Sequence, residues 1–236
     1  MGNEEKSNER KDISFFKSFI PQFISNETAI NFFDKLRQSS SGKKFPDNLS
    51  KNLKNFENHK KTIEKNNGFI EDQHSFTDMN YGNKVFQYCG CEVVAAFNAM
   101  NDLTGNKDIS LPLMIEYFEN DGIILSGIFG TAPTAIKDYF TFQGFETAST
   151  TMEEDYDKFG QIYDTFIFTF YVDKYNIFKQ VHAVNICKKD GKLTVHNNGN
   201  KSYLKQYNSI SDFINKENNG NYKGIYLIGI KRKISS

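Results

Sequence analysis

The sequence predicts an α+β fold, because helical patterns come first along the chain and strand patterns follow. Between residues 26 and 143 the apolar side chains recur mostly at helical spacing, in runs bounded by capping residues and glycine stops. From residue 165 onward the pattern changes to short β-branched and aromatic runs, separated by clusters of Asn and Gly. Helices followed by an antiparallel sheet are typical of α+β domains.

A helical N-terminal extension, residues 1–75, precedes a main domain that we assign to residues 76–236. Three amphipathic segments lie between the polar linkers of this extension: residues 13–24, 26–38 and 48–65. The apolar stripe of the third segment consists of Leu49, Leu53, Phe56 and Ile63. We expect these stripes to pack against the main domain, and the alternative is a pro-segment or an arm that lies on a membrane surface.

The main domain begins with a strong helix pattern over residues 91–104. Apolar side chains cover most of its circumference, and Gly105 stands where helix C-termini favour glycine. This pattern predicts a buried helix. A second helix follows, with Ser110 as its N-cap, a proline in its first turn and Gly122 just past its end.

The segment "SGIFGTAPTAIKDYF" repeats this pattern, with Thr131 or Thr134 as the cap of a third helix and Gly144 as its stop. A glycine-rich loop before a helix can bind phosphate, but the lysine and the Ser/Thr of a P-loop are missing. We therefore expect Gly127 and Gly130 to shape a tight connection instead.

Four strands are predicted in the last part of the chain: residues 165–172, 181–188, 192–197 and 224–233. The sequence "KKDGK" between the second and third strands predicts a tight hairpin turn. A short helix over residues 211–216 precedes the last strand.

Composition excludes several classes of protein. Lys plus Arg equals Asp plus Glu at 29 each, so no excess of positive charge favours a nucleic-acid partner. The polar start "MGNEEKSNERKD" has no secretory h-region, and no apolar run approaches the roughly 18 residues of a membrane span. Three cysteines do not make a disulfide framework. We expect a soluble cytoplasmic protein without a cofactor.

The two neighbouring cysteines carry the strongest chemical signal. Cys89 and Cys91 are too close for a typical zinc pair, and a thioredoxin-like pair needs two intervening residues. Cys91 falls in the first turn of the predicted buried helix, where free backbone N–H groups and the helix dipole favour a thiolate. Cys91 is therefore well placed to act as a nucleophile.

A thiol nucleophile needs a base, and the base needs a group that orients it. His182 opens the strand "VHAVNI", and Asn197 ends the next strand. The predicted hairpin brings these two positions side by side. A Cys, a His and an Asn in this order make the set that acyl transfer requires.

The segments "GCEVVAAFNAM", "HAVNI" and "VHNN" resemble the papain-like cysteine peptidases, in particular the bacterial double-glycine peptidases that process bacteriocin leaders, and their stand-alone relatives. The resemblance covers about residues 80 to 230. It implies a papain-like fold, a buried nucleophile-bearing helix on an antiparallel sheet. It also implies Cys91 as nucleophile, His182 as base, Asn197 as orienter and Gln87 as oxyanion donor.

Two departures from the family leave alternatives open. The family usually has Asp-Pro at the orienter, where this chain has two asparagines, so Asn198 is the alternative partner of the histidine. The oxyanion glutamine commonly stands about six residues before the nucleophile, whereas Gln87 stands four before it, so Asn83 is the alternative donor.

The expected function is therefore that of a thiol hydrolase, a peptidase that acts on a peptide or protein. An acyltransferase or a non-peptide amidase with the same triad is one alternative, and an inactive papain-like binding module is another. We interpret Cys187 as a packing residue, and we expect His196 to point away from the site. Glu92 is expected to act as a first-turn acid that complements the helix dipole.

Overall fold

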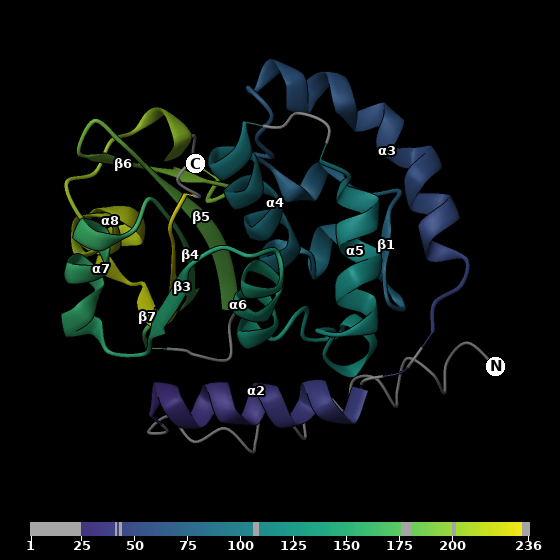
Figure 1. Cartoon of the computed structure of the whole chain (residues 1–236), viewed down its shortest axis with the longest axis horizontal. Helices are drawn as coiled ribbons and strands as arrows, with labels where there is room; N and C mark the ends of the chain where they lie inside the picture. The colour runs from purple at the N-terminus through teal and green to yellow at the C-terminus, as the bar shows by residue number, and fades with distance from the viewer. Residues whose placement is uncertain are drawn as a thin grey trace.

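A five-stranded antiparallel sheet, in the order β3-β7-β4-β5-β6, forms the central layer of the molecule (Figure 1). Its strands are β3 (Thr147–Thr150), β4 (Thr165–Tyr171), β5 (Val181–Lys189), β6 (Lys192–His196) and β7 (Lys223–Ile230). The computed structural model describes residues 25–40, 42, 44–105, 109–175, 181–199 and 202–232. The predicted helix over residues 13–24 lies outside these residues.

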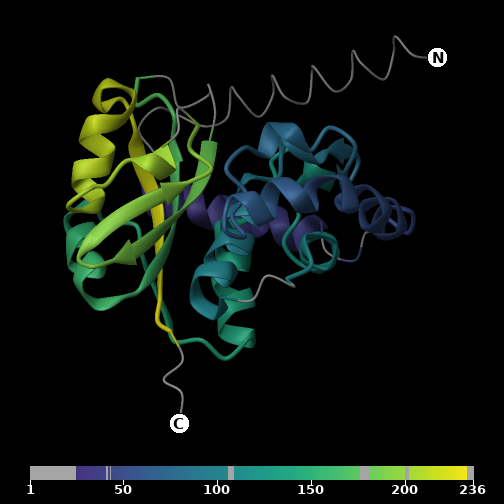
Figure 2. The ribbon, with the colours of Figure 1, turned by 90° about the horizontal axis from the view of Figure 1, so that it is seen from above.

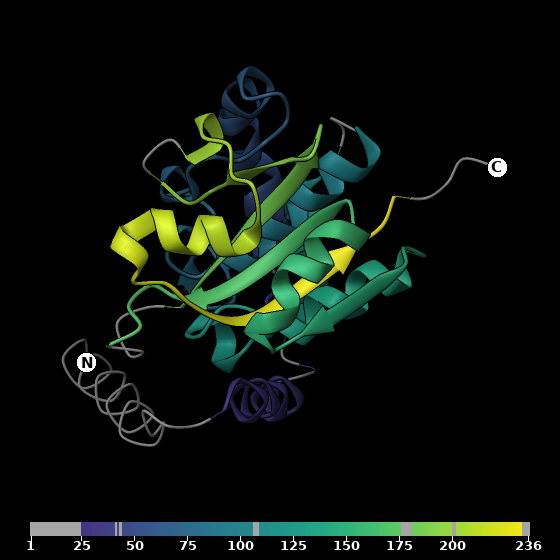
Figure 3. The same ribbon diagram turned by 90° about the vertical axis from the view of Figure 1, so that its left-hand side faces the viewer.

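Helices cover both faces of the sheet (Figures 2 and 3). The helices on one face are α4 (Cys91–Thr104) and α6 (Pro133–Phe142), and those on the other are α7 (Tyr156–Ile162) and α8 (Ile210–Lys216). Beyond α4 lie α5 (Leu111–Asn120), α3 (Asn48–Lys65) and the small hairpin of β1 (Asn80–Tyr81) and β2 (Lys84–Val85). The remaining helix, α2 (Asn26–Ser40), packs beside α6 and β7. No helix in the described parts of the chain combines the length and the apolarity that crossing a membrane requires.

The sheet separates two apolar cores. Ala183 of β5 and Ile167 of β4 face the larger core, which contains α4, whereas Val184 and Phe168 face the smaller core under α8. Successive side chains of a strand point to opposite faces, which explains this division. Every residue of β4 is buried because both faces of its sheet are covered, so its sequence is a nearly continuous apolar run.

The predicted helix that carries Cys91 is confirmed as α4. Its residues 91–101 are all buried, and Gly105 adopts φ 60° at the helix C-terminus. The predicted cap of α5 is also confirmed, because the Ser110 side chain accepts a hydrogen bond from the Leu113 N–H. The predicted cap of α6 is wrong. Ala132 occupies that position, while Thr131 and Thr134 bond to Tyr81 and Asp34 instead.

The described helices of the N-terminal extension, α2 and α3, belong to the same core as α4. The predicted stripe of α3 is correct for Phe56 and Ile63, but Leu53 is 44% exposed. Asn52 is buried instead, because its side chain bonds the backbone of Asn80 in β1 through both its amide nitrogen and its oxygen, each at 2.8 Å. Amide side chains thus satisfy backbone groups between α3 and the small hairpin.

The predicted hairpin between β5 and β6 is confirmed. Its turn residues Asp190 and Gly191 have φ angles of 51° and 75°, as the tightest hairpin turns require. Pairing of the two strands runs from this turn to Asn185 and His196. β5 extends beyond that pair to Val181, so one edge of its first residues faces no strand. The candidate site lies at this edge.

Candidate active site

Cys91 is the first residue of α4. Gly90, directly before it, allows the preceding turn to pack closely against the start of the helix. A Cβ atom on Gly90 would lie 2.5 Å from the ring of Phe86, so the turn Phe86–Tyr88 packs directly against the start of the helix. The Gly90 carbonyl accepts the first helical hydrogen bond, from the Val94 N–H at 2.8 Å. Cys91 therefore stands among the free amide groups of a helix N-terminus.

The Cys91 thiol contacts two groups. Its Sγ donates a hydrogen bond to Glu92 Oε2 at 3.0 Å, and the backbone N–H of Ala183 in β5 faces the sulfur. Burial raises the pKa of Cys91 well above its usual value, and the Glu92 carboxylate raises it further, while the Ala183 N–H lowers it. The thiol is therefore neutral in this arrangement.

Glu92 lies in the first turn of α4, as expected, and its carboxyl group is buried, only 4% exposed. Burial raises its pKa to about 7, although the Cys91 thiol and the Thr131 N–H both stabilise the carboxylate. Gly130 makes room for it, because a Cβ atom there would lie 2.9 Å from Glu92 Oε2. The glycine-rich connection thus packs beside the thiol.

His182 has a defined tautomer. Its Nε2 lies 2.7 Å from the backbone carbonyl oxygen of Asn197, and a carbonyl only accepts hydrogen bonds, so Nε2 carries the proton. The other ring nitrogen, Nδ1, is buried and has no hydrogen-bond partner among the residues that the structure describes. Burial lowers the pKa of His182 below 6.5, while the bond to Asn197 opposes this shift. The ring is therefore neutral at pH 7, with the lone pair on Nδ1.

Cys91 contacts β5 at Ala183, the residue after His182, but no hydrogen bond among the described residues joins the thiol to the His182 ring. The His182 ring lies on the sheet face of Phe170, with ring centroids 5.7 Å apart, whereas Ala183 faces α4. A backbone N–H lies in the plane of the sheet, so its contact with Cys91 places the sulfur beside the strand. The structure therefore does not bring the Cys91 thiol and His182 Nδ1 into contact, and their pairing stays a prediction.

Asn197, the predicted orienter, contacts His182. The contact is made by its main-chain carbonyl and not by its side-chain amide. Asn197 has φ 64°, and its side chain turns instead to Gln73. The alternative partner, Asn198, accepts a hydrogen bond from Tyr222 at 3.3 Å.

The predicted oxyanion donor, Gln87, is half-buried on the turn Phe86–Tyr88 that precedes Cys91. Its backbone carbonyl accepts a hydrogen bond from Gln73 Nε2 at 3.1 Å. The alternative donor, Asn83, is exposed at the tip of the hairpin of β1 and β2, where its N–H bonds Ser126. The role of Gln87 in catalysis stays a prediction.

The other cysteines and His196 have structural partners. Cys89 is buried, its Sγ donates to the Val85 carbonyl at 3.5 Å, and burial raises its pKa to about 12. Cys187 is buried against Asn185, at 3.0 Å. His196 bonds Glu71 at 2.7 Å and stacks on Phe69. All three cysteines are free thiols, and no cluster of His, Cys, Asp or Glu among the described residues has the arrangement of a metal site.

Comparison with protein-family models, curated proteins and solved structures finds no match to this chain. The candidate site therefore rests on its own geometry. Sequence reasoning missed two of its residues, Glu71 and Gln73, which follow α3 in a polar stretch without a recognisable pattern. Both contact the end of β6 more than 120 residues away along the chain.

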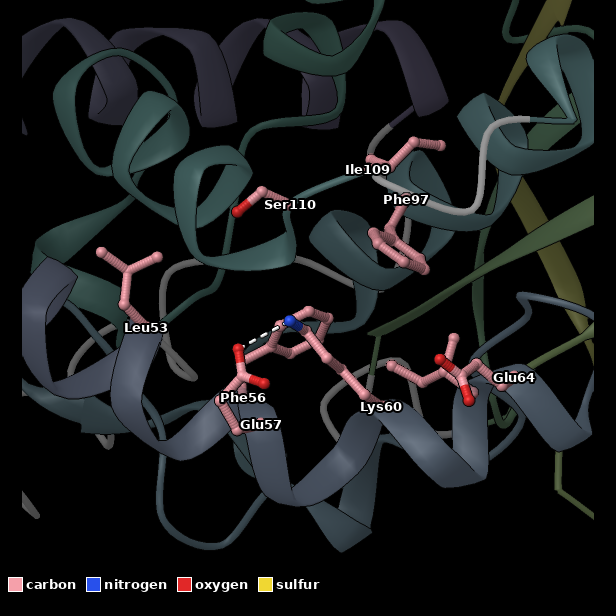
Figure 4. A pocket seen from close by; sticks show the side chains of 9 residues that line it. Leu53, Phe56, Glu57, Lys60, Glu64, Phe97, Ile109 and Ser110 are labelled. Carbon is pink, nitrogen blue, oxygen red and sulfur yellow. Dashed lines mark ion pairs between the residues drawn. The ribbon is translucent and has the colours of Figure 1, made fainter.

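A separate pocket of about 250 Å³ lies between α3, α4 and the start of α5 (Figure 4). Phe56, Ile63 and Phe97 form much of its apolar wall, and an ion pair of Glu57 and Lys60 lies at its rim. It includes neither Cys91 nor His182. We therefore assign the candidate site from its chemistry and not from the size of a cavity.

We expect the buried Glu92 carboxyl group to make stability fall as the pH rises from about 4.5 to 7. Its pKa is 4.5 when exposed and about 7 in the fold, so the folded state holds the proton more tightly over this window. The stabilisation of the fold by protonated Glu92 is fully present below pH 4.5, and it is lost as the pH rises through about 7. Its size is about 3 kcal/mol. Chemical denaturation across this pH range in wild type and Glu92→Gln measures it.

The informative quantity is the difference in the free energy of unfolding between these two proteins, because all other titrating groups are common to both. The wild type should lose about 3 kcal/mol relative to Glu92→Gln between pH 4.5 and 7. A difference that stays constant over this range would contradict the buried carboxyl group.

Proposed function

We propose that this protein is a thiol hydrolase, a papain-like peptidase that cleaves a peptide amide with Cys91, His182 and Asn197. One observation carries the proposal. The Nε2–H of His182 donates to the Asn197 carbonyl, which leaves Nδ1 buried, unprotonated and without a partner in the described part of the chain. Cys91 stands at a helix N-terminus and contacts β5 at Ala183, the residue after this buried base, and a base and a thiol so placed have the properties that thiol activation needs.

The proposed reaction begins when the Cys91 S–H turns from Glu92 toward His182 Nδ1. Nδ1 takes the proton while the sulfur attacks the amide carbonyl carbon, which forms a tetrahedral oxyanion. The imidazolium then returns this proton to the leaving amine, the C–N bond breaks, and a thioester to Cys91 remains. Water attacks the thioester with His182 again as base, and the acid product leaves with the thiol restored.

Three further groups support these steps in the proposal. The Asn197 carbonyl keeps the ring in the productive tautomer and accepts a hydrogen bond from Nε2–H throughout the reaction. The backbone N–H of Cys91 and the side chain of Gln87 stabilise the oxyanion. The Cys91 N–H is one of the unpaired amides at the start of α4, and Gln87 lies on the turn directly before it.

An inactive papain-like binding module is the second candidate, and one observation favours it. The Cys91 thiol is buried, bonds Glu92 and has a raised pKa, so it resembles a packed core residue. The two candidates differ in whether Cys91 turns over a substrate. The three free thiols suit a reducing compartment under either candidate, and we propose the cytoplasm with a peptide or protein partner.

We expect the wild-type protein to cleave peptides from a proteome-derived library, and Cys91→Ala to cleave none of them. The measurement is the appearance of new peptide termini by mass spectrometry. Cys89→Ala is the matched control, since it removes a buried thiol two residues away and should keep the cleavage pattern. No new termini from the wild type, or the same termini from Cys91→Ala, would reject the peptidase in favour of the binding module.

A further inference from the structure

Gln73 is a buried glutamine, only 3% exposed, between two parts of the candidate site. Its backbone N–H donates to Asn197 Oδ1 at 3.0 Å, and its Oε1 accepts from Asn197 Nδ2 at 2.9 Å. Its Nε2 donates to the Gln87 carbonyl at 3.1 Å. The side chain thus joins the end of β6 to the turn that precedes Cys91.

The Asn197 backbone needs such support. Its φ of 64° is a left-handed conformation that residues with side chains seldom adopt, although asparagine tolerates it better than most. This conformation coincides with the contact between the Asn197 carbonyl and His182 Nε2. The paired bonds to Gln73 hold the side chain, and a bond from the Asn197 N–H to Glu71 at 3.3 Å supports the backbone.

We propose that Gln73 is a positioning residue of this site, which fixes the tautomer of His182 through Asn197. The inference rests on the proposed function for its catalytic meaning. When the Gln73 side chain is removed, the Asn197 side chain keeps its bond from the Gln73 backbone N–H but loses the bond to Oε1, so the Asn197 carbonyl is held less firmly toward Nε2. The neutral ring then also populates the other tautomer, in which Nδ1 carries the proton and no longer accepts one from Cys91.

The bond to Gln87 adds a second effect of the same residue. Gln87 lies on the turn whose Phe86 ring packs on Gly90, directly before Cys91. Gln73 therefore fixes the distance between Asn197, which contacts His182, and the turn that precedes Cys91. Reaction rates depend steeply on such distances, so the residue matters beyond its contribution to stability.

The test compares Gln73→Met with Asn52→Leu in the full chain. Gln73→Met keeps the length of the side chain and removes its donor and acceptor. Asn52→Leu is the matched control, because Asn52 is an equally buried amide that clamps a backbone, at Asn80 and outside the site. Both variants should lose stability. Nitrogen NMR of the histidine rings reads the His182 tautomer, and iodoacetamide labelling at pH 7 reads Cys91 reactivity.

We expect Gln73→Met to show a mixture of His182 tautomers and labelling of Cys91 slowed about tenfold or more, while Asn52→Leu keeps the wild-type tautomer and rate. A single Nε2–H tautomer in Gln73→Met would overturn the proposal. If that variant does not fold, Asn197→Ala removes the side-chain amide of Asn197 and with it both bonds to Gln73, and it carries the same expectations. The tautomer readout needs no activity, so it decides on Gln73 even if Cys91 proves unreactive and the proposed function fails.

Discussion

Replacing His182 with alanine will lower Cys91-dependent peptide hydrolysis about a thousandfold or more. The neutral thiol has a pKa well above its usual value, so almost no thiolate exists at pH 7 without a base. General-base removal of a proton and its return to the leaving group are both lost in the variant, and each contributes about a hundredfold or more. Hydrolysis of a fluorogenic peptide library measures the loss.

The matched control for this prediction is His59→Ala. His59 is also partly buried and bonds a carboxylate, Asp78, at 2.9 Å, but it lies on α3 outside the site. Its replacement should reduce stability and leave the rate per folded molecule unchanged. An equal loss of rate in both variants would show that histidine removal acts through folding and not through chemistry.

Gly130→Ala will destabilise the protein by about 2–4 kcal/mol and alter the surroundings of Cys91. The backbone of Gly130 has φ 70°, which disfavours any residue with a Cβ atom. The added methyl group would also lie 2.9 Å from both the Cys89 carbonyl oxygen and Glu92 Oε2. The cost of the backbone strain and the cost of the steric clash add up to the expected loss of stability. Thermal and denaturant unfolding measure it.

Gly105→Ala separates these two contributions. Gly105 has a similar φ of 60°, but no atom of the described residues lies within 4 Å of a Cβ atom there, so the backbone strain of about 1 kcal/mol remains. The difference between the two variants isolates the contact with Glu92 and Cys89. Equal losses of stability in the two variants would contradict the close contact of Gly130 with Glu92 and the Cys89 carbonyl.

Local patterns predicted the elements of the fold wherever apolar spacing was strong. The helix from Cys91 and the hairpin at Asp190 and Gly191 were predicted correctly, because burial on all sides and a turn that needs positive φ leave clear signals. Strand β3, with the sequence TAST, was missed, since it is short, half-buried and not apolar. Its membership of the sheet is decided by pairing with β7.

Side-chain contacts of the extension were less predictable. The stripe of α3 suggested that Leu53 is buried, whereas Asn48 and Asn52 occupy the interior. The side-chain amides of these asparagines bond the backbone carbonyls of Gly82 and Asn80, about 30 residues further along the chain. Helical periodicity ranks residues by apolarity, so it does not identify an amide that is buried because a distant backbone needs it.

The candidate site shows the same limit in its details. The positions of His182 and Asn197 side by side follow from the hairpin, but the contacting atom depends on the φ of Asn197, which the sequence does not reveal. The burial of Glu92 depends on the close approach of Gly130, a residue of another segment. Gln73 reaches Asn197 across 124 residues, and no spacing pattern records such a contact.

The central claim is that His182 is the base for Cys91, and the pH dependence of Cys91 alkylation tests it most directly. Iodoacetamide labelling of each cysteine is followed by mass spectrometry in wild type and His182→Ala. We predict that the wild-type rate rises through an inflection below pH 6.5, where the buried His182 loses its proton, and that His182→Ala lacks this inflection. Identical profiles in the two proteins, each rising only at a high thiol pKa, would contradict the claim.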